Sequence, residues 1–342
     1  MAEHQHQKYS LPDRSYQGIV RSELRKLAIE GGFSGHRLGE IELIIAEVTS
    51  NLVKHAIKGG ILLARILKED GGGFELIAID DGPGIKLTAK MMEDGQTTKG
   101  TLGQGLGAIK RLSDLFDIYS MVGWGTIVFS RSYIKKNKPI TPGVFEINGI
   151  SVAKKDEVKC GDAWSVRENE NYIKIAMIDG LGHGASAHNA ATIAVEAARL
   201  YPSNNPVNEL RHMHDSLKKT RGAVVNITHL DKRNKQLVYS GVGNISMKVL
   251  SPGNVKACFS YNGIVGHILP ASLNNHNLVW NEQLDVVVMH SDGITTRWDL
   301  SKYPGILQRH GSVVSAVLYK DHDRGTDDST VIVGKISKAV NG

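Results

Sequence analysis

The sequence predicts an α+β chain of two domains, and three observations lead to this fold class. A chain of 342 residues is long for one domain and suits two of ordinary size. Residues 131–143 form a seam rich in lysine, proline and glycine, without sustained apolar periodicity. Before the seam helix-like and strand-like segments are mixed, whereas short strands and turns recur after it. We therefore expect domains at residues 1–133 and 144–342, joined by a linker at 134–143.

The N-terminal domain is expected to be an α/β sandwich with helices on one face of a mixed sheet. Helices are predicted near residues 17–29 and 34–57, because apolar side chains recur there at helical spacing. The further expected elements are strands near 61–68 and 74–79, a glycine-rich connection, a helix near 106–116 and a last hairpin ending in "GWGTIVFS".

The C-terminal domain is expected to be a layered α+β domain. The predicted elements are strands near residues 145–152, 172–178, 223–230, 236–240 and 285–290, and helices near 187–200 and 312–320.

Composition narrows the class of protein. No apolar run approaches the roughly 18 residues of a membrane span, and "MAEHQHQKYS" lacks the apolar core of a signal peptide. The only cysteines, Cys160 and Cys258, favour a reducing cytoplasm. A net charge of +6 is modest, and the basic residues are scattered rather than gathered in an aromatic-studded stripe. We expect a cytoplasmic protein that binds neither nucleic acid nor membrane.

A first group of polar residues belongs to the second helix and the segments after it. Glu47 and Asn51 share one helical face, which by itself is typical of a solvated surface. Asp80 follows a strand and precedes a glycine turn. "GTLGQGLG" then places glycines ahead of a helix, where exposed N–H groups suit phosphates. A dinucleotide fingerprint would need a strand directly before these glycines, and "MMEDGQTTK" is not one.

In this order, the Glu/Asn helix, the "IDDGPGI" turn, the glycine loop and a final "GT" strand resemble the GHKL ATPase fold, over roughly residues 15–133. Within it, "MMEDGQTTKGTLGQGLGAIKRLSD" looks closest to RsbT-like serine/threonine switch kinases and anti-sigma-factor kinases. The resemblance implies an ATP-dependent kinase in which Asn51 holds Mg²⁺ and Glu47 takes the proton of a serine or threonine hydroxyl.

The same resemblance implies the contacts of the nucleotide. Asp80 would bind the adenine amino group, with support from Thr126. Gly82 and Gly84 would shape the adenine pocket. The phosphates would be wrapped by Gly103, Gly105 and Gly107.

A second group consists of aspartates in four separate segments beyond the seam. They are Asp162 in "CGDAW", Asp179 in "IDGLGHG", Asp292 in "MHSDGI" and the pair Asp327–Asp328 in "GTDDSTVIV". Strand ends at one edge of a sheet can converge, and carboxylates without His or Cys partners suit Mg²⁺ or Mn²⁺. A single Asp-Gly pair is by contrast usually only a turn.

This arrangement resembles the SpoIIE/RsbX-like branch of the PP2C-type phosphatases over about residues 144–337, and implies a β-sandwich flanked by helices. It also implies two Mn²⁺ or Mg²⁺ ions bridged by Asp179, with the carbonyl of Gly180 as a ligand. Asp292 and Asp327 would bind the second ion. Asp162 would lie beside the first, directly or through water.

Two neighbours of these aspartates have less defined roles. Asp328 is the weaker ligand candidate of its pair, because the family places the metal on the first acidic residue before the strand. His183 is either a general acid or an ordinary loop residue, since it follows Asp179 by four positions instead of the two seen in better-known relatives.

The two resemblances together predict a bifunctional kinase and phosphatase in a bacterial partner-switching pathway. Its substrates would be STAS-type antagonist or scaffold proteins, and a downstream effector would bind the kinase domain. Two alternatives stay open: an N-terminal nucleotide-gated binding module without kinase chemistry, and an ATP-driven conformational clamp.

Overall fold

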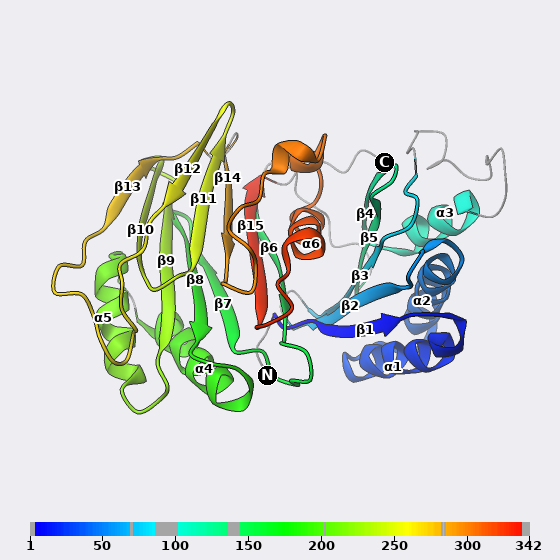
Figure 1. The fold of residues 1–342 in the computed structure, drawn as a ribbon, viewed down its shortest axis with the longest axis horizontal. Helices are drawn as coiled ribbons and strands as arrows, with labels where there is room; N and C mark the ends of the chain where they lie inside the picture. Colours follow the sequence, from blue (N-terminus) through cyan, green and yellow to red (C-terminus); the bar gives the residue numbers. More distant parts are fainter. Residues whose placement is uncertain are drawn as a thin grey trace. The chain divides into compact units, whose positions relative to one another are not determined.

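The computed structural model describes residues 4–68, 71–85, 102–135, 144–201, 203–281, 283 and 285–336. Its described residues form two compact units. The N-terminal unit takes them from His6–Thr141 and Leu300–Val317, and the C-terminal unit from Met1–Gln5, Pro142–Asp299 and Leu318–Lys338. The expected fold class, a helix-on-sheet domain followed by a β-sandwich with helices, is confirmed (Figure 1).

The N-terminal unit contains a five-stranded sheet in the order β1-β2-β3-β5-β4. The strands are β1 (Gln7–Leu11), β2 (Gly60–Leu67), β3 (Gly73–Asp80), β4 (Leu115–Met121) and β5 (Gly125–Tyr133). Every pairing among them is antiparallel, so the expected mixed sheet is wrong. Short hairpins connect β2 to β3 and β4 to β5, and a hairpin forces antiparallel pairing.

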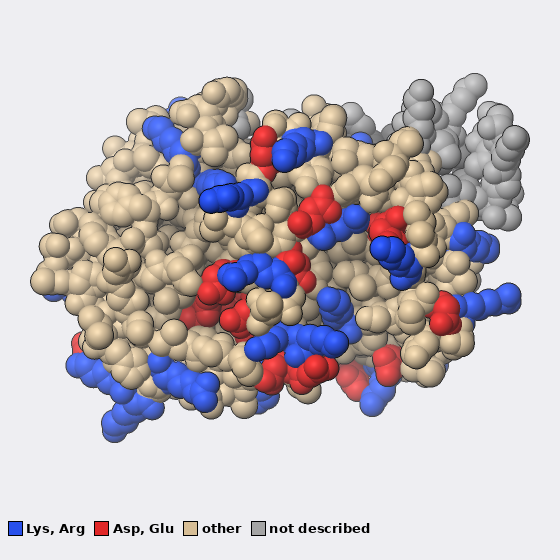
Figure 2. Space-filling view, viewed as in Figure 1, with Lys and Arg blue, Asp and Glu red and all other residues tan. Residues whose placement is uncertain are grey.

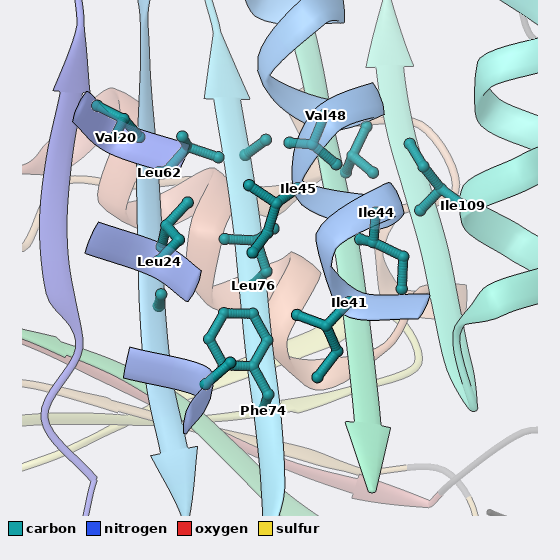
Figure 3. Packing of buried hydrophobic residues seen from close by; sticks show 14 of the residues in the cluster. Val20, Leu24, Ile41, Ile44, Ile45, Val48, Leu62, Phe74, Leu76 and Ile109 are labelled. Atoms are coloured by element: carbon teal, nitrogen blue, oxygen red, sulfur yellow. The ribbon is translucent and has the colours of Figure 1, made fainter. Parts of the chain in front are cut away.

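Helices α1 (Gln17–Glu30), α2 (Gly35–His55) and α3 (Leu102–Leu112) cover one face of this sheet, after a short 3₁₀ turn at Arg14–Tyr16 (Figure 1). The apolar stripe predicted on α2 meets the sheet: Figure 3 shows Ile41, Ile45 and Val48 packed toward Phe74 and Leu76 of β3. Burying such side chains contributes roughly 1.5–3 kcal/mol each. The hydrophobic core therefore holds α2, and its polar face, in a fixed position.

Helix α3 ends earlier than the predicted helix at 106–116. It stops at Leu112, and Leu115 and Phe116 already belong to β4. Asp114 terminates it, because its carboxylate accepts the N–H of Tyr133 at 2.7 Å and forms an ion pair with Arg37. Its own N–H donates to the carbonyl of Arg131. These contacts draw the chain into the sheet, and a local apolar pattern does not reveal them.

The C-terminal unit consists of two five-stranded antiparallel sheets. One has the order β13-β10-β9-β8-β7 and the other β12-β11-β14-β15-β6. The strands are β6 (Phe145–Val152), β7 (Asp162–Glu168), β8 (Tyr172–Gly180), β9 (Ala223–Asp231), β10 (Gln236–Val242), β11 (Ser246–Ser251), β12 (Asn254–Cys258), β13 (His276–Val279), β14 (Val286–His290) and β15 (Ser329–Ile336). Side chains from both sheets, including Trp164, Met177, Met247 and Met289, form one core between them.

Helices α4 (Gly184–Leu200) and α5 (Pro206–Leu217) pack against the sheet that contains β7, β8 and β9. The sequence analysis did not predict α5, although its start carries a recognisable signal. Asn205 caps the helix by accepting the N–H of Asn208, and Pro206 occupies the first turn. Helix α6 (Gly311–His322) and two 3₁₀ turns, Leu300–Lys302 and Ile306–Gln308, complete the described elements.

The surface carries charges of both signs. Figure 2 shows Lys and Arg side chains interspersed with Asp and Glu over the face in view. Among the helices that the structure describes, none is both long enough and apolar enough to cross a membrane.

A buried ionic cluster joins His6, the residue before β1, to β2, β3 and β5. Glu75 forms an ion pair with Arg65 at 2.8 Å and accepts a hydrogen bond from Arg131 at 2.9 Å. It also lies 3.0 Å from Nε2 of His6. Burial alone would raise the pKa of Glu75, but the two arginines hold it well below its ordinary value. Burial, and after it the charge of Arg65, lowers the pKa of His6 to about 4. His6 is therefore neutral in the folded protein near pH 6.

We expect acid to destabilise the fold through His6. In the unfolded chain His6 takes up a proton below pH ~6.5, whereas in the folded protein it does so only near pH 4. The free energy of unfolding therefore decreases as the pH falls through this window, by about 3 kcal/mol in total. Urea unfolding at several pH values should show a smaller loss in His6→Gln than in wild type. The exposed His36→Gln is the matched control. An equal loss in wild type and His6→Gln would contradict the expectation.

Candidate functional site

The polar face of α2 meets the start of α3 in the N-terminal unit. A Cβ added at Gly105 would lie 2.7 Å from Oε2 of Glu47 and 3.6 Å from Oδ1 of Asn51. Glycine therefore lets the backbone of α3 approach both side chains, and the structure brings Gly105 to two neighbouring residues of α2 that lie far from it in the sequence. Gly103 and Gly107 lie in the same helix, so these glycines form the first turns of α3 and not a loop before it.

The "IDDGPGI" turn is built around one carboxylate oxygen. Oδ1 of Asp80, at the end of β3, accepts the N–H groups of Gly82 at 2.8 Å and Thr126 at 3.1 Å. Gly84 has φ +71°, and a Cβ there would lie 1.9 Å from the carbonyl oxygen of Met121. Only glycine fits such a position. The turn therefore holds Asp80 in one orientation against β5.

Some of these residues line one cavity, whereas Glu47, Gly82 and Gly105 are not among its lining residues. Its walls include Asn51, Asp80, Gly84 and Thr126, together with apolar side chains of Val48, Leu52, Ala78, Ile85, Leu106 and Val128. The sequence analysis missed Ser120, whose hydroxyl lies 2.9 Å from that of Thr126 and accepts the N–H of Ile85 at 2.8 Å. Its position opposite Thr126 in the β4–β5 pairing, which is a tertiary feature, identifies it.

The cavity suits a nucleotide by its chemistry. Apolar walls with a few fixed polar groups are typical of sites for small molecules and cofactors. Nδ2 of Asn51 is buried and has no hydrogen-bond partner among the described residues, which indicates a missing polar neighbour. Residues 86–101, which include the expected start of the phosphate loop, lie outside the described residues.

In the C-terminal unit, strand register brings the first two acidic residues together. Asp162 begins β7 and is paired directly with Asp179 at the end of β8. Oδ2 of Asp162 accepts the hydroxyl of Ser291, at 2.6 Å, one residue before Asp292. The sequence analysis did not select Ser291. Two neighbouring strands and a segment that is distant in the sequence thus meet at one place.

A cavity of about 430 Å³ opens beside this pair. Asp179, Asp292 and Asp327 line it, with Asn244 and Asn262 among the other walls, whereas Asp162 is buried and does not line it. Burial, and then the charge of Asp162, raises the pKa of Asp179 well above its ordinary value. Burial, against the hydrogen bond from Ser291, raises the pKa of Asp162 to about 8. Converging carboxylates that repel one another suit a multivalent cation.

The donor set fits Mg²⁺ or Mn²⁺, since it offers oxygen atoms and a negative charge. Within the described part of the chain, no three His, Cys, Asp or Glu side chains are gathered closely enough to hold an ion as they stand. Gly180 closes β8, where a Cβ would lie 2.2 Å from the carbonyl oxygen of Ala187. Glycine thus allows α4 to pack against the strand end that carries Asp179.

The two adjacent aspartates of the Asp327–Asp328 pair have different surroundings. Oδ1 of Asp328 accepts the N–H of Lys154 at 2.7 Å, and Oδ2 accepts the N–H of Gly161 at 2.8 Å. Asp328 therefore fixes the loop that leads into Asp162. Asp327 faces the cavity.

His183 is the residue that precedes α4. Its Nδ1 lies 2.7 Å from Oε1 of Glu157, and its side chain is half exposed. This pairing orients the imidazole, and it is compatible with either of the two roles that the sequence leaves open.

Comparisons with known proteins match both halves of the chain. Residues 11–129 match the histidine kinase-like ATPase domain family. The serine/threonine-protein kinase RsbT of Bacillus subtilis is 37% identical over 111 residues, which are 32% of this chain and 84% of RsbT. The chain belongs to the RsbT family. We refer to this part as the RsbT-like domain.

The C-terminal half has relatives of its own. Residues 169–336 match the stage II sporulation protein E (SpoIIE) family, and we refer to this part as the SpoIIE-like domain. The phosphoserine phosphatase RsbX of Bacillus subtilis is 24% identical over 208 residues, which are 60% of this chain and 98% of RsbX. The chain thus fuses an RsbT-like domain to a SpoIIE-like domain that is similar to RsbX.

Solved structures agree with this assignment. A chain described with the bacterial stressosome shares 30% identity and a TM-score of 0.53, over 56% of this chain and all of that one. RsbX in complex with magnesium shares the fold, with 21% identity and a TM-score of 0.50, over 56% of this chain and 96% of that one.

Asn244 is a residue that the sequence analysis missed and that holds Asp292. Its Nδ2 donates to Oδ2 of Asp292 at 2.9 Å. The sequence predicts that Asp292 is a metal ligand, and a residue that binds a ligand's side chain orients it. We therefore expect Asn244→Ala to weaken Mn²⁺ binding by about 10–100-fold. Isothermal titration with Mn²⁺ measures this, with the exposed Asn254→Ala on β12 as control. Equal affinity in Asn244→Ala and wild type would contradict the expectation.

Proposed function

We propose that this chain is a bifunctional signalling enzyme, in which residues 1–133 phosphorylate serine or threonine in a partner protein and residues 144–342 remove the phosphate, with 134–143 as linker. The substrates are STAS-domain antagonist or scaffold proteins of a partner-switching pathway in the cytoplasm. The RsbT-like domain also binds a downstream effector.

The proposed kinase activity is supported by the close approach of Gly105 to Glu47 and Asn51. Phosphoryl transfer needs a carboxylate near the nucleophile and a held cation near the phosphates. Glu47 is the base for the substrate hydroxyl, and Asn51 holds Mg²⁺. Asp80 and Thr126 bind the adenine in a pocket shaped by Gly82 and Gly84. The N–H groups at the start of α3, around Gly103, Gly105 and Gly107, face the phosphates.

The proposed phosphatase activity is supported by the cavity that Asp179, Asp292 and Asp327 line. These residues, with Asp162 and the carbonyl of Gly180, would hold two Mn²⁺ or Mg²⁺ ions. Such ions supply activation of water and neutralise charge that develops on a phosphate. Asn244 orients Asp292, while Asp328 and Ser291 hold the surrounding loops and Asp162 in place.

One experiment tests both halves. The protein is incubated with γ-labelled ATP, Mg²⁺ and a STAS-domain partner, and label on the partner is followed with and without Mn²⁺. Label should accumulate with Asp179→Asn and be removed by wild type in Mn²⁺. If Asp179→Asn binds nucleotide yet transfers no label, the RsbT-like domain is a nucleotide-gated binding module instead of a kinase. If labelled partner survives wild type and Mn²⁺, the phosphatase assignment is wrong.

A further inference from the structure

Two arginines of the C-terminal unit lie at the rim of the carboxylate cavity, and we call them the rim arginines. The first is Arg221: a Cβ added at Gly182, which lines the cavity, would lie 2.8 Å from its Nη1. The second is Arg324, whose Nη1 donates to the carbonyl of Asp292 at 3.1 Å. Asp292 lines the same cavity. Each guanidinium group thus lies beside the backbone of a residue that forms the cavity wall.

The loop that carries Arg221 is held against the turn that follows β8. The N–H of Leu181 donates to the carbonyl of Gly222 at 3.1 Å. The hydroxyl of Thr220 accepts the N–H of Gly222 at 2.9 Å and donates to the carbonyl of Leu217 at 2.8 Å. Gly222 has φ +78°, a conformation that glycine adopts at little cost. Because both of its neighbours are anchored, the backbone of Arg221 has a fixed place beside the cavity.

Arg324 is also anchored, in the loop that leads into β15. Its N–H donates to the carbonyl of Gly293 at 2.8 Å. Oδ1 of the preceding residue, Asp323, accepts the hydroxyl of Ser329 at 2.7 Å. Asp327, three residues after Arg324, lines the cavity. The loop therefore presents an arginine outside the cavity and an aspartate within it.

The charge of the rim arginines is not used by a neighbouring carboxylate. Both side chains are exposed, and within the described part of the chain neither forms an ion pair. A positive charge at this place repels the divalent cations that the cavity suits, so the two residues do not serve metal binding. Neither is a lining residue of the cavity. A phosphate held inside therefore leaves their N–H groups available to the part of the substrate that stays outside.

We propose that Arg221 and Arg324 bind acidic side chains next to the phosphorylated residue of the substrate protein, so that the SpoIIE-like domain selects phosphoserine or phosphothreonine within an acidic segment. This rests on the proposed phosphatase activity of the same cavity. A guanidinium group offers parallel N–H donors that match the two oxygens of a carboxylate. An exposed ion pair typically changes binding by about 1.4- to 5-fold, so two independent pairs would change it by about 2- to 25-fold.

The test compares two phosphoserine peptides that differ only in the residues beside the phosphoserine, which are aspartate in one and asparagine in the other. With wild type and Mn²⁺, phosphate release should have a kcat/KM at least ~2-fold higher for the acidic peptide. The difference should lie in KM, because the flanking contact is the same before and during phosphate transfer. It should decrease as NaCl is added, since salt screens exposed charges.

Variants assign the preference to the rim arginines. Arg221→Gln should lower it, the double variant Arg221→Gln/Arg324→Gln should remove it, and Arg221→Glu should favour a peptide with flanking lysines. Arg233→Gln is the matched control, because exposed Arg233 follows β9 and Arg221 precedes it, so the two lie at opposite ends of one strand. All rates are measured at saturating Mn²⁺, since Arg324→Gln also removes a hydrogen bond to Asp292.

Binding gives a readout that does not depend on turnover. In an Asp179→Asn background, fluorescence anisotropy should show tighter binding of the acidic phosphopeptide than of the neutral one, and no difference once both arginines are replaced. Hydrolysis of both peptides by wild type at equal kcat/KM would overturn this inference alone. A loss in Arg221→Gln that is equal for both peptides and for p-nitrophenyl phosphate would place Arg221 on the phosphate and overturn its role toward acidic residues. Absence of hydrolysis of all three substrates would overturn the proposed phosphatase activity as well.

Discussion

Asp179→Asn should abolish phosphatase activity while the metal-free protein becomes no less stable. The substitution removes the charge that lies between the two expected metal positions, and a lost metal site removes several kcal/mol of transition-state stabilisation, or about 10³-fold or more in rate. Turnover of a phosphorylated STAS partner, and of p-nitrophenyl phosphate, measures the loss.

The stability part of this prediction follows from the electrostatics of the cavity. Burial and the charges of Asp162, Asp292 and Asp327 disfavour the ionised form of Asp179, as its raised pKa indicates. Asparagine has no charge to bury, so thermal unfolding in EDTA should occur at the same or a higher temperature than in wild type. A variant that is inactive because it fails to fold would instead unfold at a lower temperature. A variant that keeps wild-type turnover would contradict the metal-bridging role.

Glu47→Gln should abolish phosphorylation of the partner and leave nucleotide binding in place. General base catalysis typically contributes about 10²–10⁴-fold, and glutamine keeps the shape of the side chain without its basicity. Transfer of label from γ-labelled ATP measures the rate, in an Asp179→Asn background so that dephosphorylation does not obscure it. Binding of a fluorescent nucleotide measures the site itself.

The chain offers a matched control on the same helix. Glu42 lies on α2, is partly exposed and pairs with Arg25, so Glu42→Gln should keep full transfer. Asn51→Ala should by contrast lose Mg²⁺-dependent nucleotide binding. Equal transfer by Glu47→Gln and wild type would contradict the base role. Loss of nucleotide binding in Glu47→Gln would show that Glu47 acts in binding and not in the chemical step.

Much of the fold could be predicted from the sequence because the signals are local. The apolar stripe of α2 recurs with the helical period, and it packs in the core as expected. Asp80 in β3 and Asp179 in β8 lie at the ends of their strands, as the glycine turns that follow them predicted. The functional roles of these residues stay predictions, which the variants above test.

Other features could not be predicted in this way. The helix predicted at 106–116 ends at Leu112, since Arg37 and Tyr133 bind Asp114 from distant segments. Asn244 and Ser291 carry no motif of their own, and only their contacts with Asp292 and Asp162 identify them.

By itself, the sequence determined the two fold types, the order of their elements and the acidic residues at strand ends, because periodicity and turn chemistry act within a few residues. Only the tertiary structure decided that Asp162 is paired with Asp179, and that Asp328 binds backbone while Asp327 faces the cavity. These outcomes depend on strand register and on contacts between residues that are far apart in the sequence. They are therefore determined by the free energy of the whole fold and not by local sequence preferences.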